Sequence, residues 1–181
     1  MHNNLSDCIP RHRRYALFPN VLHPKRELLL EPTLEDLYAY EPRLVASDLL
    51  SVDIETAFGQ ITTVGFAPDA EHALCIPFLD RRVPSRNYWK TAQEEMAARL
   101  FVKRILEGPT PKLGQSFGNY DSFWFLRKWH IAPRNYREDT KLIHHALYPE
   151  LPKSLEFMGA SYGTQGSWKH WGRKQKVKKD D

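Results

Sequence analysis

The chain has 181 residues, of which 41% are hydrophobic and 27% are charged, and its formal net charge is +4. This length is sufficient for one domain with a sizeable core. We find no apolar run of membrane-spanning length and no apolar segment of signal-peptide type at the N-terminus. Two cysteines, Cys8 and Cys75, without a secretion signal argue against a disulfide framework. They favour a reducing compartment, so we expect a cytoplasmic protein.

The positive charge is concentrated near the two ends of the sequence. Residues 11–14 read Arg-His-Arg-Arg, and residues 169–179 are rich in lysine and arginine. Such runs are compatible with nucleic-acid binding, but they are equally typical of solvated chain ends.

The predicted elements alternate between strands and helices. Residues 1–32 are proline-rich with little periodicity, and we interpret them as an irregular arm. A helix is expected from its N-cap Thr33 to about Tyr40, because Pro42 follows. Segments 49–55, 59–66 and 72–78 predict an antiparallel meander. We then expect helices at 91–106, 120–130, 138–147 and 154–162, a short strand at 112–117, and a basic tail at 166–181. This order predicts an α/β fold.

The first predicted strand contains two acids at alternating positions, Asp53 and Glu55. Successive strand residues point to opposite faces, so the two carboxylates share one face and Val52 and Ile54 share the other. Two adjacent carboxylates repel each other, and a pair of divalent cations would relieve that repulsion. The alternative is two solvent-facing acids on an edge strand.

A third acid, Asp121, follows Gly118-Asn119-Tyr120 at a predicted strand-to-helix junction. On its own, Asp121 is readily interpreted as a helix N-cap. If the sheet brings it beside Asp53 and Glu55, the three carboxylates become candidate metal ligands.

These residues resemble a known pattern. Val52-Asp53-Ile54-Glu55-Thr56, followed by Asn119-Tyr120-Asp121, is similar to the first two motifs of the DEDD (DnaQ-like) 3′–5′ exonucleases. The stretch from Asp139 to Leu155, with its Pro-Glu-Leu-Pro segment, most resembles the exonuclease domain of family A, phage-type DNA polymerases. The similarity covers residues 33–165.

The resemblance implies an RNase H-like fold with a mixed five-stranded sheet flanked by helices. It also implies a two-metal site for Mg²⁺ or Mn²⁺, with the ions about 4 Å apart. Asp53 would bridge both metals, Glu55 would bind the metal on the side of the attacking water, and Asp121 would bind the second metal. Hydrolysis would occur at the 3′ end of single-stranded DNA or RNA, in a proofreading role. The implied setting is the cytoplasm of a bacterial or phage-infected cell.

The expected nucleic-acid contacts are the residues that flank the acids and the aromatic, basic tail. They are Thr56, Asn119, Tyr120, Trp168, Lys169 and Trp171. Single-strand binders combine basic grooves with aromatic stacking surfaces. A further aromatic run, Phe123-Trp124-Phe125, is interpreted as core packing, because consecutive helical residues cannot all face one groove.

Two departures from the family pattern affect the site. The motif asparagine precedes Asp121 by two residues instead of four. The third motif, an aspartate with Tyr four or His five residues before it, is absent, because none of Asp139, Asp180 and Asp181 has either residue there. The second metal is therefore expected to be weakened, and the C-terminal helix that carries this motif is expected to be missing.

Three hypotheses explain the missing aspartate. The chain is an exonuclease whose remainder, with a polymerase module, lies on a separate polypeptide. Alternatively, it is a degenerate exonuclease that binds single-stranded nucleic acid or a polymerase partner and cleaves slowly. As a third hypothesis, it keeps the fold only for contacts with other proteins.

Overall fold

The computed structural model describes residues 25–162 of the chain. These residues divide into a larger unit, Arg26–Leu147, and residues 148–162, which belong to a smaller unit. The smaller unit contributes one described helix, α7 (Leu155–Tyr162). No described helix is both long and apolar enough to cross a membrane.

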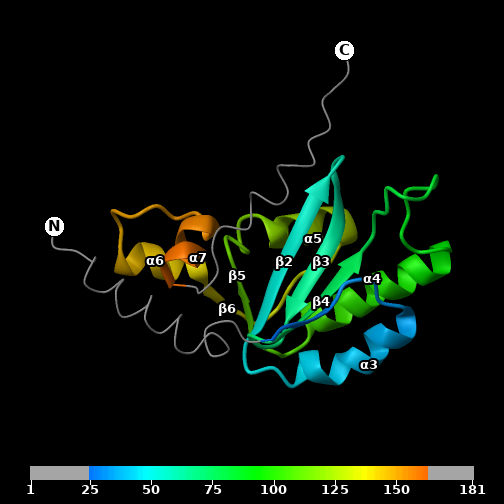
Figure 1. Cartoon of the computed structure of the whole chain (residues 1–181), viewed down its shortest axis with the longest axis horizontal. Helices are drawn as coiled ribbons and strands as arrows, with labels where there is room; N and C mark the ends of the chain where they lie inside the picture. The colour runs from blue at the N-terminus through cyan, green and yellow to red at the C-terminus, as the bar shows by residue number, and fades with distance from the viewer. Residues whose placement is uncertain (1–24, 163–181) are drawn as a thin grey trace, which may run out of the picture. The chain divides into compact units, whose positions relative to one another are not determined.

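The larger unit is built on a mixed six-stranded sheet (Figure 1). Its strands, in the spatial order β1-β4-β3-β2-β5-β6, are β1 (Glu27–Leu29), β4 (His72–Pro77), β3 (Gln60–Ala67), β2 (Leu50–Ala57), β5 (Lys112–Gly114) and β6 (Tyr136–Asp139). Strands β2, β3 and β4 form the predicted antiparallel meander, whereas β1, β5 and β6 pair in parallel with their neighbours. The expectation of five strands is therefore corrected to six.

The two strands that the sequence did not predict are short. Strand β1 lies in the segment expected to be an irregular arm, and β6 lies at the start of the segment expected to be a helix from residue 138. Each follows the register of a longer-range partner, since Glu27 pairs with His72 and Tyr136 with Lys112. Such short strands are specified by pairing more than by their own periodicity.

Four helices complete the larger unit: α3 (Leu34–Val45), α4 (Ala92–Glu107), α5 (Asp121–Trp129) and α6 (Thr140–Leu147). Helix α3 begins as predicted, with a capping box between Thr33 and Asp36. It does not end before Pro42 but continues to Val45. Leu44 is fully buried in this last turn, and packing of that side chain outweighs the lost proline hydrogen bond.

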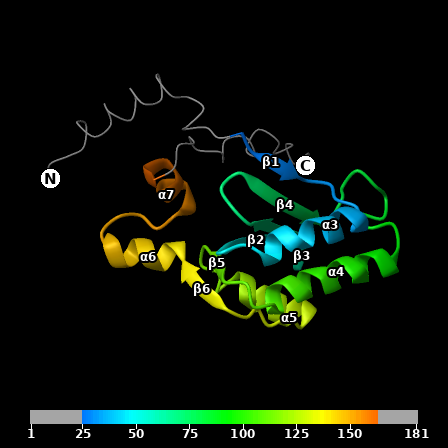
Figure 2. The same ribbon diagram turned by 90° about the horizontal axis from the view of Figure 1, so that it is seen from below.

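The core lies between one face of the sheet and helices α3, α4 and α5, which Figure 2 shows on the same side of the strands. Sheet residues that face these helices are buried, among them Val64, Phe66, Leu74 and Ile76. Asp53 and Glu55 lie on the opposite face. Burial of one face therefore fixes the register that exposes the acids.

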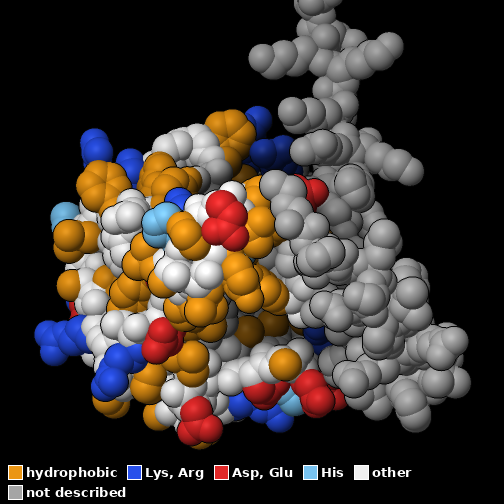
Figure 3. Space-filling model, turned by 90° about the vertical axis from the view of Figure 1, so that its left-hand side faces the viewer, with side chains coloured by type: hydrophobic (Ala, Val, Ile, Leu, Met, Phe, Trp, Pro, Cys, Tyr) orange, Lys and Arg blue, Asp and Glu red, His pale blue; other side chains and the backbone are white. Residues whose placement is uncertain are grey.

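Helix α6 leaves much of its apolar surface exposed. Leu142, Ile143 and Leu147 are exposed, although His144 is buried. Figure 3 views the molecule from the left-hand side of Figure 1 and shows many hydrophobic side chains at that surface among charged ones.

Candidate active site

Strand β2 presents the two acids on one face and apolar side chains on the other. Val52 and Ile54 are 2% and 6% exposed, whereas Asp53 and Glu55 are exposed. This confirms the predicted alternation. Strand β2 lies between β3 and β5, so the acids are not on an edge strand. Asp53 lies opposite Gly65, which has no side chain to fill the space beside the carboxylate.

Asp121 meets β2 where the neighbouring strand has ended. Strand β5 pairs with β2 only at Leu50 and Ser51. Beyond that point the backbone N–H of Ile54 donates to Oδ1 of Asp121 at 3.1 Å. Buried backbone donors need a partner, and the Asp121 carboxylate supplies the acceptor that a longer β5 would otherwise provide. Asp121 is consequently only 3% exposed.

A tight connection from β5 to α5 places Asp121. A Cβ added to Gly114 would lie 2.5 Å from Cβ of Phe117, so only glycine fits there. Ser116 has a positive φ of 60°, and its carbonyl accepts from the N–H groups of Asn119 and Tyr120. Tyr120 rather than Asp121 occupies the N-cap of α5, which corrects the simple N-cap interpretation of Asp121.

Among residues 25–162, no lysine or arginine offsets the negative charge of Asp53 and Asp121. Burial, the charge of Asp53 and a smaller effect of Asp139 raise the pKa of Asp121 to about 7, against the opposing N–H groups of Asp121 itself and Ile54. Asp53 is exposed as a whole residue, but partial burial of its carboxyl group and the charge of Glu55 raise the pKa of Asp53, against the opposing Ile54 N–H. Within the described part of the chain neither shift has a contribution from lysine or arginine, so the site there favours any species that brings positive charge.

The donor set suits a divalent cation chemically, although the carboxylates are not gathered around one point. Among residues 25–162, no three His, Cys, Asp or Glu side chains lie close enough together to hold a metal ion. Asp53 interacts electrostatically with both Glu55 and Asp121. These are hard oxygen ligands of the kind that Mg²⁺ and Mn²⁺ prefer. Metal binding would require Glu55 and Asp121 to converge on Asp53.

Three of the predicted nucleic-acid contacts lie beside the acids. The hydroxyls of Thr56 and Tyr120 are hydrogen-bonded at 2.7 Å, which joins the end of β2 to the start of α5. Asn119 is exposed in the connecting turn. Trp168, Lys169 and Trp171 lie outside the described residues.

Asp139 has a structural role that sequence reasoning did not assign. Its carboxylate accepts from the backbone N–H groups of Ser116 and Lys141 and from the Tyr136 hydroxyl. These bonds, with a weaker one from Leu142, outweigh burial and hold the pKa of Asp139 below its ordinary value. Asp139 thus ties the turn before Asp121 to the start of α6. The available signal was its position in the first turn of the segment predicted to be a helix from residue 138, since an acid there can accept from free backbone N–H groups.

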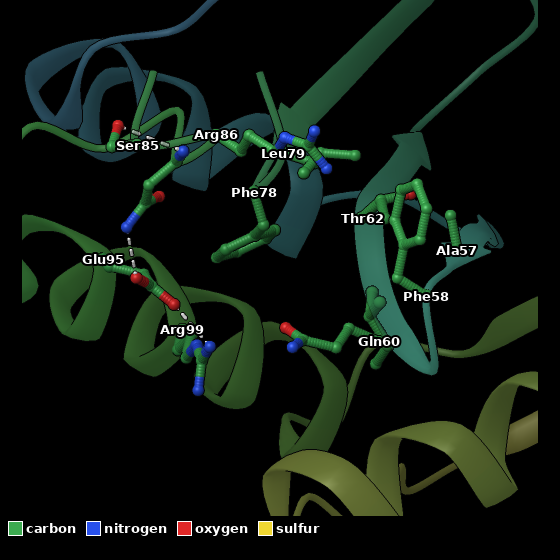
Figure 4. A pocket seen from close by; sticks show the side chains of 12 residues that line it. Ala57, Phe58, Gln60, Thr62, Phe78, Leu79, Ser85, Arg86, Glu95 and Arg99 are labelled. Carbon is green, nitrogen blue, oxygen red and sulfur yellow. Dashed lines mark hydrogen bonds and ion pairs between the residues drawn. The ribbon is translucent and has the colours of Figure 1, made fainter. Parts of the chain in front are cut away.

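A pocket of about 310 Å³ opens just beyond Thr56, at Ala57 (Figure 4). Its lining comes from the hairpin between β2 and β3, the two residues that follow β4, residues 85–87 and α4. Arg99 forms an ion pair with Glu95, which also accepts from the Asn87 amide at 2.7 Å. None of the three acids lines this pocket. No local motif could have predicted it, because its lining residues come from four separate segments.

The sequence matches no protein-family model and no curated protein. Several solved structures nevertheless share its architecture. Escherichia coli RNase D, an exoribonuclease involved in structured RNA processing, is 17% identical, with a TM-score of 0.51 over 76% of this chain and 33% of its own. The catalytic core of RRP6 from Trypanosoma brucei is 15% identical, with a TM-score of 0.56 over 76% of this chain and 34% of its own.

Brucella melitensis NrnC bound to pGG is 14% identical, with a TM-score of 0.51 over 78% of this chain and 62% of its own. The chain thus spans about a third of the RNase D and RRP6 chains and less than two thirds of NrnC. Of these three structures, RNase D is the one described as an exoribonuclease. With its mixed six-stranded sheet flanked by helices, the chain has the RNase H-like fold that these structures share.

Proposed function

We propose that this protein is a metal-dependent nuclease that hydrolyses phosphodiester bonds at the 3′ end of single-stranded nucleic acid. The observation that carries this proposal is the placement of three acids on and against β2. Asp121 is hydrogen-bonded to the strand between Asp53 and Glu55. Burial and the charge of a neighbouring acid, Glu55 for Asp53 and Asp53 for Asp121, raise the pKa of both aspartates. Such uncompensated carboxylates are a common feature of functional sites.

Asp53, Glu55 and Asp121 would hold divalent cations, which when bound neutralise phosphate charge and make a bound water more acidic. Asp53 would be the central ligand, because it interacts with each of the other two acids. Tyr120 and Thr56 are hydrogen-bonded to each other next to Glu55, where they can contact the terminal nucleotide. Asn119 borders the same position, and Trp168, Lys169 and Trp171 remain proposed contacts of the basic tail.

The substrate class is proposed as RNA or DNA 3′ ends, with RNA favoured. RNase D is described as an exoribonuclease, and NrnC was solved with pGG. These similarities support the exonuclease fold but not a particular closeness to family A polymerases. A proofreading role beside a polymerase module therefore has no support beyond the sequence resemblance.

A second candidate function is binding with little cleavage. No aspartate downstream of Asp121 in this sequence fits the third motif, and Asp139 already accepts several hydrogen bonds. Loss of general-base assistance costs on the order of 10²–10⁴ in rate. We therefore propose that these 181 residues act slowly without a further acid.

The test is digestion of a 5′-fluorescent 20-mer, as RNA and as DNA, with Mg²⁺ or Mn²⁺. We expect a ladder that shortens from the 3′ end, faster for RNA, and arrest by a 3′-terminal phosphorothioate linkage. Internal cleavage, or no metal-dependent product after prolonged incubation, would contradict the proposal. Binding without cleavage would support the second candidate.

A further inference from the structure

The exposed surface of α5 carries aromatic rings paired with cations. One row along the helix contains Tyr120, Trp124 and Lys128, and the next row contains Phe123 and Arg127. The rings of Tyr120 and Trp124 lie 6.1 Å apart, and Nζ of Lys128 lies 5.6 Å from the centre of the Trp124 ring. Cζ of Arg127 lies 5.7 Å from the centre of the Phe123 ring. These pairs follow the i,i+4 spacing of helical neighbours.

The two rows border a shallow depression of about 240 Å³. Phe123, Trp124, Arg127 and Lys128 line it. Phe123 is 53% exposed, and Trp124 is only half-buried. The interpretation of this aromatic run as core packing is therefore wrong for Phe123 and correct for Phe125, which is fully buried.

Helix stability explains only part of this surface. Cations in a last turn favour the negative end of the helix dipole, which accounts for Arg127 and Lys128. It does not account for an exposed phenyl ring and an indole beneath them. Within the described residues, neither cation forms an ion pair with an acid. After Asp121 the helix contains no acidic residue.

This surface has the charge and shape that a single strand requires. Each aromatic–cation pair offers a ring on which a base can stack and a positive group for the adjoining phosphate. Exposed acids would repel phosphate, and the helix beyond its first residue has none. A protein partner would have no comparable need for two cations that lack acidic neighbours.

The surface also begins at the proposed active site. Tyr120 is hydrogen-bonded to Thr56, which follows Glu55 in the chain. From Tyr120 to Lys128 the helix rises about 12 Å. A strand whose 3′ end lies at the acids could therefore extend along α5 with its preceding nucleotides.

We propose that Phe123, Trp124, Arg127 and Lys128 form a docking platform for single-stranded nucleic acid, which holds the nucleotides that precede the 3′-terminal one. The inference rests on the proposed function for its polarity, because the acids define the 3′ end. Its binding component is separate from cleavage and can be measured without metal. Two rings suggest that two bases are stacked.

The test is fluorescence anisotropy of a 5′-fluorescein 12-mer of uridine or thymidine, in EDTA, with the full chain. Phe123→Ala should weaken binding about 5- to 160-fold, the range expected for loss of one stacked base. Leu126→Ala is the matched control, because Leu126 is a hydrophobic residue on the same helix at 55% exposure. Its affinity should equal that of the wild type.

Salt dependence provides a second, independent readout. The double variant Arg127→Gln, Lys128→Gln should reduce the slope of log affinity against log salt by about 1.4, since each phosphate contact contributes about 0.7 on a single strand. Three results would overturn the platform. They are no binding by the wild type at low salt, equal affinity of Phe123→Ala and Leu126→Ala, and a salt slope of the double variant equal to that of the wild type.

The outcomes separate this inference from the proposed function. Normal binding through α5 with no cleavage in Mn²⁺ would support the platform and contradict the nuclease proposal. Cleavage by Phe123→Ala and by the double variant with unchanged KM would support the nuclease proposal and contradict the platform.

Discussion

The carboxylate of Asp121 accepts a hydrogen bond at 3.1 Å from the backbone N–H of Ile54, which lies 67 residues earlier in the chain. Ile54 stands between Asp53 and Glu55. The bond therefore fixes the third acid against the strand that carries the other two. It forms because β5 ends early and leaves the Ile54 donor for a side chain to satisfy.

Asp121→Asn should stabilise the metal-free protein at neutral pH. The amide oxygen can still accept from Ile54, but the buried negative charge is removed. The pKa of Asp121 is raised to about 7 from 3.8, so the native state binds more protons between those values and stability falls as pH rises. The increase in unfolding free energy of Asp121→Asn over the wild type should be absent below pH about 4 and reach at most about 4 kcal/mol above pH 7. Urea unfolding in EDTA measures this increase.

Asp139→Asn should destabilise the protein at neutral pH, in contrast to Asp121→Asn, and it is the matched control. The pKa of Asp139 is held below its ordinary value, so its charge stabilises the fold above the unfolded pKa, and this stability is lost as pH falls. Removing the charge weakens bonds from Ser116, Lys141 and Tyr136, with an expected loss of about 1–3 kcal/mol at pH 7. The same sign for both variants at pH 7 would contradict this electrostatic description.

Gly114→Ala should distort the turn that leads to Asp121. The new methyl group would lie 2.5 Å from Cβ of Phe117, so the backbone or the buried ring must shift. We expect destabilisation of about 1–3 kcal/mol together with reduced cleavage. Gly65→Ala is the control for stability, since the atom nearest to its added Cβ is the Asp53 carbonyl oxygen at 3.7 Å, an ordinary contact. Equal unfolding midpoints in urea would show that the turn is not constrained.

Because Lys112 is buried, we expect the stability of the fold to depend on pH in the alkaline range as well. This lysine is fully buried, donates to the carbonyls of Gly108 and Thr110 at 2.8 Å each, and burial lowers its pKa to about 8. The unfolded chain therefore binds more protons between pH 8 and 10.5, so stability rises with pH in this range.

The measurement compares the wild type with Lys112→Met by urea unfolding at pH 7.5 and pH 10. The difference in unfolding free energy should shift in favour of the wild type by up to about 3 kcal/mol. A difference that is constant across this range would contradict the lowered pKa.

The sequence predicted correctly those features that depend only on residues close together in the chain. The capping box of Thr33 and Asp36 and the alternation of Val52 with Asp53 follow from neighbouring residues, and both are present. Strands β1 and β6 were missed because three or four residues carry too little periodicity and depend on distant partners. The continuation of α3 through Pro42 depends on burial of Leu44, which is a tertiary effect.

The sequence identified candidate acids but not how the fold places them. The acids could be identified from their pattern, because alternation and a strand-to-helix junction are visible in sequence. The bond from Ile54 to Asp121 requires the lengths and register of β2 and β5, which no local pattern encodes. The exposure of Phe123 likewise depends on how α5 is rotated against the sheet.

The most direct test of the central claim is the rate of 3′-nucleotide release from single-stranded RNA in saturating Mn²⁺ by the wild type, Asp53→Asn and Asp48→Asn. Asp48 is an exposed acid just before β2 and serves as the matched control. We predict that Asp53→Asn lowers the rate at least about 100-fold, because it removes the proposed metal ligand that interacts with both other acids, whereas Asp48→Asn leaves the rate unchanged. Equal rates for all three proteins, or equal loss in both variants, would contradict the account.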